Sequence, residues 1–173
     1  MVAVLRSDPR SLTGNWVAVI SCGSAKTDRT DWPIPAQELY TGGLFKMYRR
    51  YCERFLPRWV ILSAKYGLIP REFPIPEPYS VKLGRDRDGE SEEVKVARLY
   101  EQALALDLDS CSGVVVFGGR AYLYLVAKAL RLMGVPTYRA WPGDPKLWLI
   151  TKTLHHALKD DRFLPPTGPV VPP

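Results

Sequence analysis

Small, polar and basic residues follow an apolar run near the amino end of the chain, and they are the first group that could do chemistry. The run Trp16 to Ile20 carries no charge, and it gives way to Ser21-Cys-Gly-Ser-Ala-Lys26. Backbone N–H groups of Gly23 and Ser24 could face an anion or a carbonyl there, and the lysine would add a point charge. A plain polar turn is the alternative interpretation of this stretch.

The same pattern recurs twice further along the chain. Apolar runs at 59–62 and 114–117 also end in small, polar or basic residues, which are Ser63, Lys65, Tyr66 and Gly67 in the first case and Gly118, Gly119 and Arg120 in the second. Uncharged runs of this kind are typical of parallel strands that are buried on both faces. Because the carboxyl ends of parallel strands meet at one edge of a sheet, we expect all three polar segments to line a single crevice.

The side chains around these segments include candidates for each task in chemistry on a nucleobase. Such chemistry needs a stacking surface, a cation for phosphate or a developing anion, and an acid or base. The stacking candidates are Tyr40, Phe45, Tyr66 and Tyr79, next to the polar Thr41; the cationic ones are Lys26, Lys65 and Arg120; the acid or base would be Glu38 or Asp144. For Tyr79, a role in fixing its loop to the protein body is an equally good interpretation.

Two of these residues could also act as nucleophiles. Cys22 lies beside the expected N–H donors and Lys26, both of which would lower its pKa. With no histidine nearby in the sequence, a small residue chosen for its size is the favoured alternative. Lys65 could attack only if desolvation lowered its pKa, so we expect it to be a charged anchor.

The elements that must position these residues alternate regularly. Four strand-like runs alternate with four helix-like segments, which predicts an α/β fold, a three-layer sandwich with a parallel sheet of about four strands. Residues 69–83 contain four prolines and are expected to form a long loop or flap. The expected domain covers residues 1–163, and the Pro-rich tail, residues 164–173, is expected to be disordered.

Composition narrows the class of protein. The length of 173 residues and the 46% hydrophobic content fit a single globular domain, and no apolar stretch is long enough to cross a membrane. The net charge of +6 favours a polyanionic partner, DNA or RNA, although basic proteins without such partners are common. Three scattered cysteines suggest neither a disulfide framework nor a zinc site. We therefore expect a cytoplasmic protein without metal or cofactor.

Several of these motifs occur together in one known family. Ser21-Cys-Gly-x-x-Lys26, Pro35-Ala-x-Glu-Leu-Tyr-Thr41, Ser63-Ala-Lys-Tyr-Gly-Leu68 and Pro78-Tyr79 resemble those of small bacterial, archaeal and phage proteins known only as a domain of unknown function. That family is remotely similar to the catalytic region of archaeosine synthase, which acts on a modified guanine in transfer RNA. The resemblance implies the uracil-DNA glycosylase fold.

The sequence also departs from the glycosylase pattern. The turn after the first strand holds no acidic or amide residue, and Trp141-Pro-Gly-Asp144 stands where a glycosylase has His-Pro-Ser. Uracil excision is therefore not expected. Two hypotheses remain: an enzyme that modifies a base or acts on an N-glycosidic bond, and a non-catalytic module that binds a nucleotide or nucleic acid.

Overall fold

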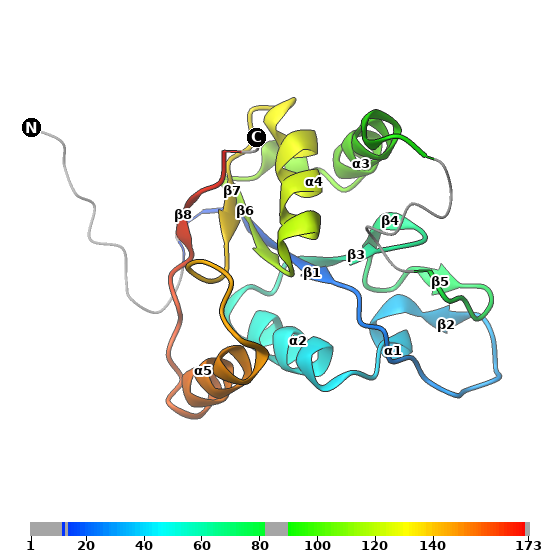
Figure 1. The fold of residues 1–173 in the computed structure, drawn as a ribbon, viewed down its shortest axis with the longest axis horizontal. Helices are drawn as coiled ribbons and strands as arrows, with labels where there is room; N and C mark the ends of the chain where they lie inside the picture. Colours follow the sequence, from blue (N-terminus) through cyan, green and yellow to red (C-terminus); the bar gives the residue numbers. More distant parts are fainter. Residues whose placement is uncertain (1–11, 13, 82–89, 172–173) are drawn as a thin grey trace, which may run out of the picture.

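A mixed sheet of six strands forms the centre of the protein, in the order β4-β3-β1-β6-β7-β8. The computed structural model describes the chain except for residues 1–11, 13, 82–89 and 172–173. The start of the expected domain and the end of the expected tail therefore lie outside the described residues. Two short strands, β2 (Ile34–Pro35) and β5 (Pro74–Ile75), pair separately beside the main sheet (Figure 1).

The four strands in the middle of the order are parallel, and they are the four that the apolar runs predict. They are β1 (Trp16–Ser21), β3 (Trp59–Ser63), β6 (Gly113–Phe117) and β7 (Thr137–Arg139). Two antiparallel strands that we did not expect form the edges, β4 (Gly67–Pro70) and β8 (Thr167–Pro169). The sheet is therefore mixed. Its edge strand β4 overlaps the first two residues of the segment that was expected to be a loop, and β8 lies in the segment that was expected to be a disordered tail.

Helices cover both faces of the sheet (Figure 1). Successive strand residues point to opposite faces, so Ala18 and Ile20 pack with α2 (Gly43–Phe55) and α5 (Leu147–Lys159). Val17 and Val19 pack with α3 (Glu92–Ala105) and α4 (Arg120–Arg131). The short helices α1 (Ala36–Leu39) and η1 (Leu108–Ser110) complete the fold. The result is an α/β protein with three layers.

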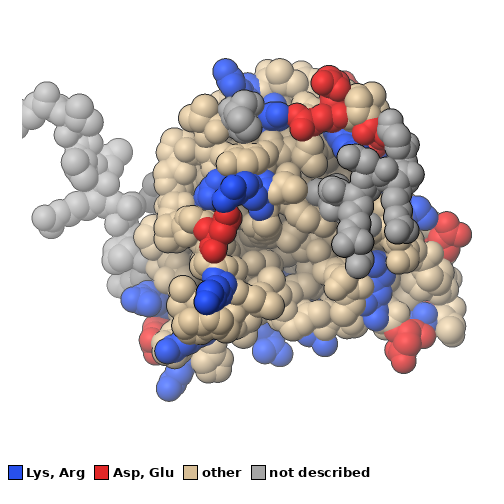
Figure 2. Space-filling model, viewed as in Figure 1, with Lys and Arg blue, Asp and Glu red and all other residues tan. Residues whose placement is uncertain are grey.

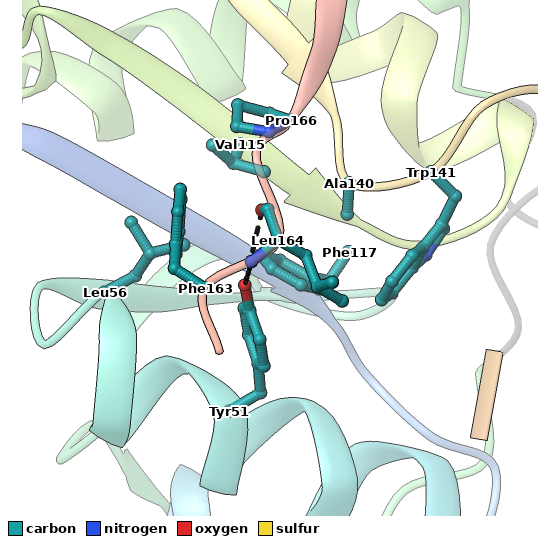
Figure 3. A pocket seen from close by; sticks show the side chains of 9 residues that line it. All are labelled: Tyr51, Leu56, Val115, Phe117, Ala140, Trp141, Phe163, Leu164 and Pro166. Carbon is teal, nitrogen blue, oxygen red and sulfur yellow. Dashed lines mark hydrogen bonds between the residues drawn. The ribbon is translucent and has the colours of Figure 1, made fainter. Parts of the chain in front are cut away.

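The segment after α5 is fixed to the aromatic core by one tyrosine. The Tyr51 hydroxyl accepts a hydrogen bond from the Leu164 N–H group at 2.8 Å and donates one to its carbonyl oxygen at 3.3 Å (Figure 3). Phe163, which is 5% exposed, packs against Phe55 beside this contact. The chain then runs on to pair with β7 as β8. Contacts that are distant in sequence therefore order a segment whose composition is typical of disorder.

Candidate site at the carboxyl edge of the sheet

The three polar segments that follow parallel strands lie at one edge of the sheet. Ser21 pairs with Leu62, the residue before Ser63, and Ile20 pairs with Phe117, the residue before Gly118. A side chain at Gly118 would place its Cβ only 2.9 Å from the Ser21 Cβ and Oγ atoms. Glycine therefore lets β6 turn into α4 directly against the end of β1.

Ser63 organises a chain of hydroxyl groups at this edge. Its side chain is buried, and its oxygen accepts the N–H groups of Lys65 and Tyr66, each at 3.2 Å. The same oxygen lies 2.9 Å from the Tyr79 hydroxyl, which in turn is hydrogen-bonded to the Tyr40 hydroxyl. Because a hydroxyl oxygen has two lone pairs, the two N–H groups occupy both, and the Ser63 proton is left to donate to Tyr79.

Burial keeps this chain neutral. Loss of solvent raises the pKa of both Tyr40 and Tyr79, and for Tyr40 the neighbouring Tyr79 raises it further. Both phenols therefore keep their protons at physiological pH and can donate hydrogen bonds. Tyr79 joins the turn after β3 to the segment that precedes α2, and these contacts fix its loop to the body of the protein.

Two lysines converge on Tyr79. The Lys26 Nζ atom lies 4.5 Å from the centroid of the Tyr79 ring, and the Lys65 Nζ atom lies 5.5 Å from the same centroid. Lys65 is paired with Glu77 at 3.1 Å, whereas among the described residues no carboxylate lies within ion-pairing distance of Lys26. The two ammonium groups and one carboxylate leave a net positive charge beside an aromatic ring.

The environment of Lys65 favours its charged form. Contact with Tyr66, and then the hydrogen bond to Glu77, raises the pKa of the Lys65 ammonium. An amine nucleophile needs the opposite shift, because only the unprotonated amine can attack. The geometry is therefore that of a cationic anchor.

Cys22 faces a residue that the sequence analysis did not include in the site. Its Sγ atom lies 3.6 Å from the Tyr122 hydroxyl, in the first turn of α4. Burial raises the pKa of Tyr122, and so does its contact with Cys22. A sequence signal for Tyr122 did exist, because a helix that begins at the carboxyl edge of a sheet presents its first turn to that edge.

Only some of the backbone N–H and carbonyl groups in the turn after β1 form hydrogen bonds. The Cys22 N–H group donates to the Leu62 carbonyl at 3.0 Å, and the Ala25 carbonyl accepts from Thr41 at 3.0 Å. Within the part of the chain that the structure describes, the N–H groups of Gly23 and Ser24 have no acceptor. The residue before α4 is Gly119, which has no side chain that could cap the helix. No side-chain cap therefore accepts a hydrogen bond from the first N–H groups of α4, which lie at the same edge.

Two of the four stacking candidates are core residues. Tyr40 and Phe45 are each only 2% exposed and pack against one another, with ring centroids 5.1 Å apart. Neither ring is accessible to a ligand, because α1, α2 and the turn after β1 close over them. Tyr66 and Tyr79 remain half-exposed, with their rings edge to face at 5.4 Å.

The two carboxylates that were expected to act as acid or base are held by arginines. Glu38 accepts a hydrogen bond from Arg29 at 2.6 Å on the surface, and Asp144 is paired with Arg120. No contact joins either carboxylate to the Ser63–Tyr79 chain among the described residues. The groups at the site that can move a proton are instead the phenols and the Cys22 thiol.

Comparison with known proteins gives the chain a family. The model of a family of unknown function, DUF6884, matches residues 17–140. The chain belongs to this family. The matched region begins within β1 and ends just after β7, so it contains the segments that build the carboxyl edge.

A curated relative extends the comparison. The uncharacterized protein YfjM of Bacillus subtilis (strain 168) is 25% identical over 129 residues, which cover 73% of this chain and 82% of the relative. No solved structure matches the chain.

The described residues contain neither a membrane-spanning helix nor a cluster of metal-binding side chains. Among the described residues, no helix is both long enough and apolar enough to cross a lipid bilayer. Nor do these residues contain a group of three histidine, cysteine or acidic side chains that could hold a metal ion.

Proposed function

We propose that the protein recognises a nucleobase or nucleoside, carried by DNA or RNA, at the carboxyl edge of its sheet. The observation that supports this most directly is the convergence of Lys26 and Lys65 on the ring of Tyr79. An aromatic ring and cationic groups together suit a ligand with a planar face and an adjacent phosphate. The unpaired N–H groups of Gly23 and Ser24 would add donors for an anionic oxygen.

The surface charge supports an anionic macromolecule. The chain has a net charge of +6, and Lys26 has no carboxylate partner in the described region. Figure 2 shows a hollow near the middle of one face, and in the same view Figure 1 places the amino end of α4 and helix α2 around it. Figure 2 shows the basic groups on this face as separate clusters, some of them beside acidic groups, so a short segment of nucleic acid fits better than a long duplex.

We also infer that this binding serves a reaction on the base or on its N-glycosidic bond. Cys22 and Tyr122 lie at the same edge, so a thiol and a neutral phenol are available beside the bound group. This inference extends the resemblance to the archaeosine synthase catalytic region and to the uracil-DNA glycosylase fold, for which the three layers and four central parallel strands are the support. We place the activity in the cytoplasm, where the three free cysteines would stay reduced.

A non-catalytic binding module is the second candidate. It is favoured by one specific observation, the engagement of both Glu38 and Asp144 with arginines. In this case the crevice would hold a nucleotide without changing it. Mass spectrometry of nucleosides from DNA and transfer RNA, incubated with the protein and with Cys22→Ser, separates the two candidates by the presence or absence of a modified or released base.

The binding itself is tested by titration with short single-stranded DNA and RNA over a range of salt concentrations. Affinity should fall as salt rises, because each neutralised phosphate releases counterions. Lys26→Ala should weaken binding and reduce the slope of log K against log salt by about one, whereas Lys26→Arg should retain part of the affinity. Arg131→Ala, at an exposed position at the carboxyl end of α4, is the matched control.

Binding that ignores salt, or that Arg131→Ala weakens as much as Lys26→Ala, would contradict the proposed site. Binding confined to free nucleosides would limit the function to a small-molecule ligand.

A further inference from the structure

Three consecutive large apolar residues are exposed where α5 begins. Leu147 is 58% exposed, Trp148 is 61% exposed and Leu149 is 42% exposed. The other four tryptophans of the chain are buried or half-buried. Isolated apolar residues on a surface need no explanation, but a contiguous group that includes a tryptophan is typical of an interaction site.

The loop that leads into this apolar group contacts the edge of the sheet where the candidate site lies. The segment between β7 and α5 leaves the carboxyl end of β7, and its Asp144 is paired with Arg120, the first residue of α4. Arg120 lies two residues after Gly118, which packs against Ser21. Since a chain extends by at most about 3.6 Å per residue, the Cα atom of Trp148 lies within about 14 Å of that of Asp144.

The backbone that carries Trp148 is well anchored. The N–H groups of Leu149 and Ile150 donate to the Lys146 carbonyl, at 2.9 and 3.2 Å. The Thr151 hydroxyl donates to the carbonyls of Leu147 and Trp148. The indole is therefore displayed from an ordered helical turn, so a ligand does not have to order this backbone when it binds.

The charge around the apolar group is positive. Between positions 139 and 159 the chain has one acidic residue, Asp144, and four lysines or arginines, which are Arg139, Lys146, Lys152 and Lys159. The carboxylate is neutralised by Arg120. An exposed indole within a basic segment is complementary to nucleotides, in which bases present flat apolar faces and phosphates are anionic.

We propose that Trp148 stacks on a base of the single strand that flanks the nucleotide held in the crevice, with Lys146 beside its phosphate. This inference rests on the proposed function, and it adds the requirement that the ligand extends beyond one nucleotide. The strand would run from Tyr79, past the Arg120–Asp144 pair, to the first turn of α5. DNA and RNA offer the same stacking faces and phosphates, so both are included in the test.

The experiment compares a 12-residue single-stranded DNA, an RNA of the same sequence, and a nucleoside monophosphate, for four variants. Trp148→Ala and Trp148→Leu should weaken binding of an oligonucleotide about 5- to 150-fold, the range for loss of one base–aromatic stack. Trp148→Phe should retain most of the affinity, because it keeps a ring. Leu132→Ala is the matched control, because Leu132 is 66% exposed at the opposite end of α4.

The outcomes separate this inference from the proposed function. Loss in the Ala and Leu variants with unchanged binding of the monophosphate supports the inference, and stronger binding of one oligonucleotide identifies the natural strand. Equal oligonucleotide binding by wild type and Trp148→Ala overturns it and leaves the crevice intact. Retention by Trp148→Leu, or a change in oligomeric state in Trp148→Ala, overturns it in favour of apolar contact with a protein. Binding of the monophosphate alone overturns it, and no binding of any probe overturns both proposals.

Discussion

Gln102 offers a quantitative test of how the site is held in place. This residue of α3 reaches the turn after β3, where its Oε1 atom accepts the Leu68 N–H group at 2.9 Å and its Nε2 atom donates to the Tyr66 carbonyl at 2.7 Å. The same side chain lies against Gly67, where a Cβ atom would come within 2.1 Å of the Gln102 Oε1 atom and where the φ of +74° favours glycine. One glutamine therefore satisfies both backbone groups that flank this glycine.

Replacement of Gln102 by alanine should destabilise the protein by about 2–3 kcal/mol. Each buried backbone group that loses its partner costs about 1–3 kcal/mol, and water entering beside the half-buried Tyr66 reduces the sum. The gain in helix propensity on changing glutamine to alanine is only a few tenths of a kcal/mol. For a chain of 173 residues this loss corresponds to a fall in melting temperature of about 4–12 °C.

Urea denaturation measures the free energy of unfolding, with the neighbouring exposed substitution Glu101→Ala as control. Gln102→Glu should not rescue stability at neutral pH, because the carboxylate oxygen that replaces the Nε2 amide faces the Tyr66 carbonyl and two acceptors repel one another. A loss below about 0.5 kcal/mol for Gln102→Ala, the size expected for an ordinary surface change, would refute the reasoning.

Two further predictions concern tyrosines. Tyr79→Phe removes the hydroxyl group that joins Ser63 to Tyr40 and leaves the buried Tyr40 hydroxyl without that partner. The free energy of unfolding measured in urea should fall by about 1–3 kcal/mol. An unchanged free energy of unfolding would contradict the hydroxyl chain. Burial raises the pKa of Tyr48 to about 12. The contribution of the neutral Tyr48 phenol to the free energy of unfolding is therefore complete below pH 10, where the phenol is neutral in the unfolded chain as well. That contribution is lost as the pH rises from 10 to 12, because the unfolded phenol ionises first. Over that interval the wild type should lose about 1.4 kcal/mol per pH unit more than Tyr48→Phe, and identical pH profiles of the unfolding free energy would exclude this.

The parallel strands could be predicted because their signal is local. Runs such as Val114 to Phe117 are uninterrupted, β-branched and followed by small residues, and these features alone indicate a buried strand with a turn at its carboxyl end. The edge strands could not be found in this way. β4 ends at Pro70 and β8 at Pro169, and both owe their existence to partners supplied by β3 and β7. Pairing of this kind depends on the neighbouring strands of the assembled sheet, so it cannot be predicted from a short segment of sequence.

The same distinction applies to the site. The positions of Lys26, Lys65 and Tyr79 follow from the strands that precede them or the loop that joins them, and the structure brings these three together. The contact between Cys22 and Tyr122 spans 100 residues and depends on how α4 leaves β6. The ion pairs of Glu38 and Asp144 with arginines could not be predicted either, because the sequence does not show whether an acidic side chain is free or paired.

Gln102 has one more consequence, for contacts between molecules. β4 is an edge of the sheet, and an exposed edge strand is a template on which a strand of another chain can pair. The Leu68 N–H group that such a strand would need is already given to Gln102, and Pro70, the last residue of β4, has no N–H group to offer. At the other edge β8 ends in Pro169. The side chain that fixes the turn after β3 thus also blocks growth of the sheet into an intermolecular ribbon.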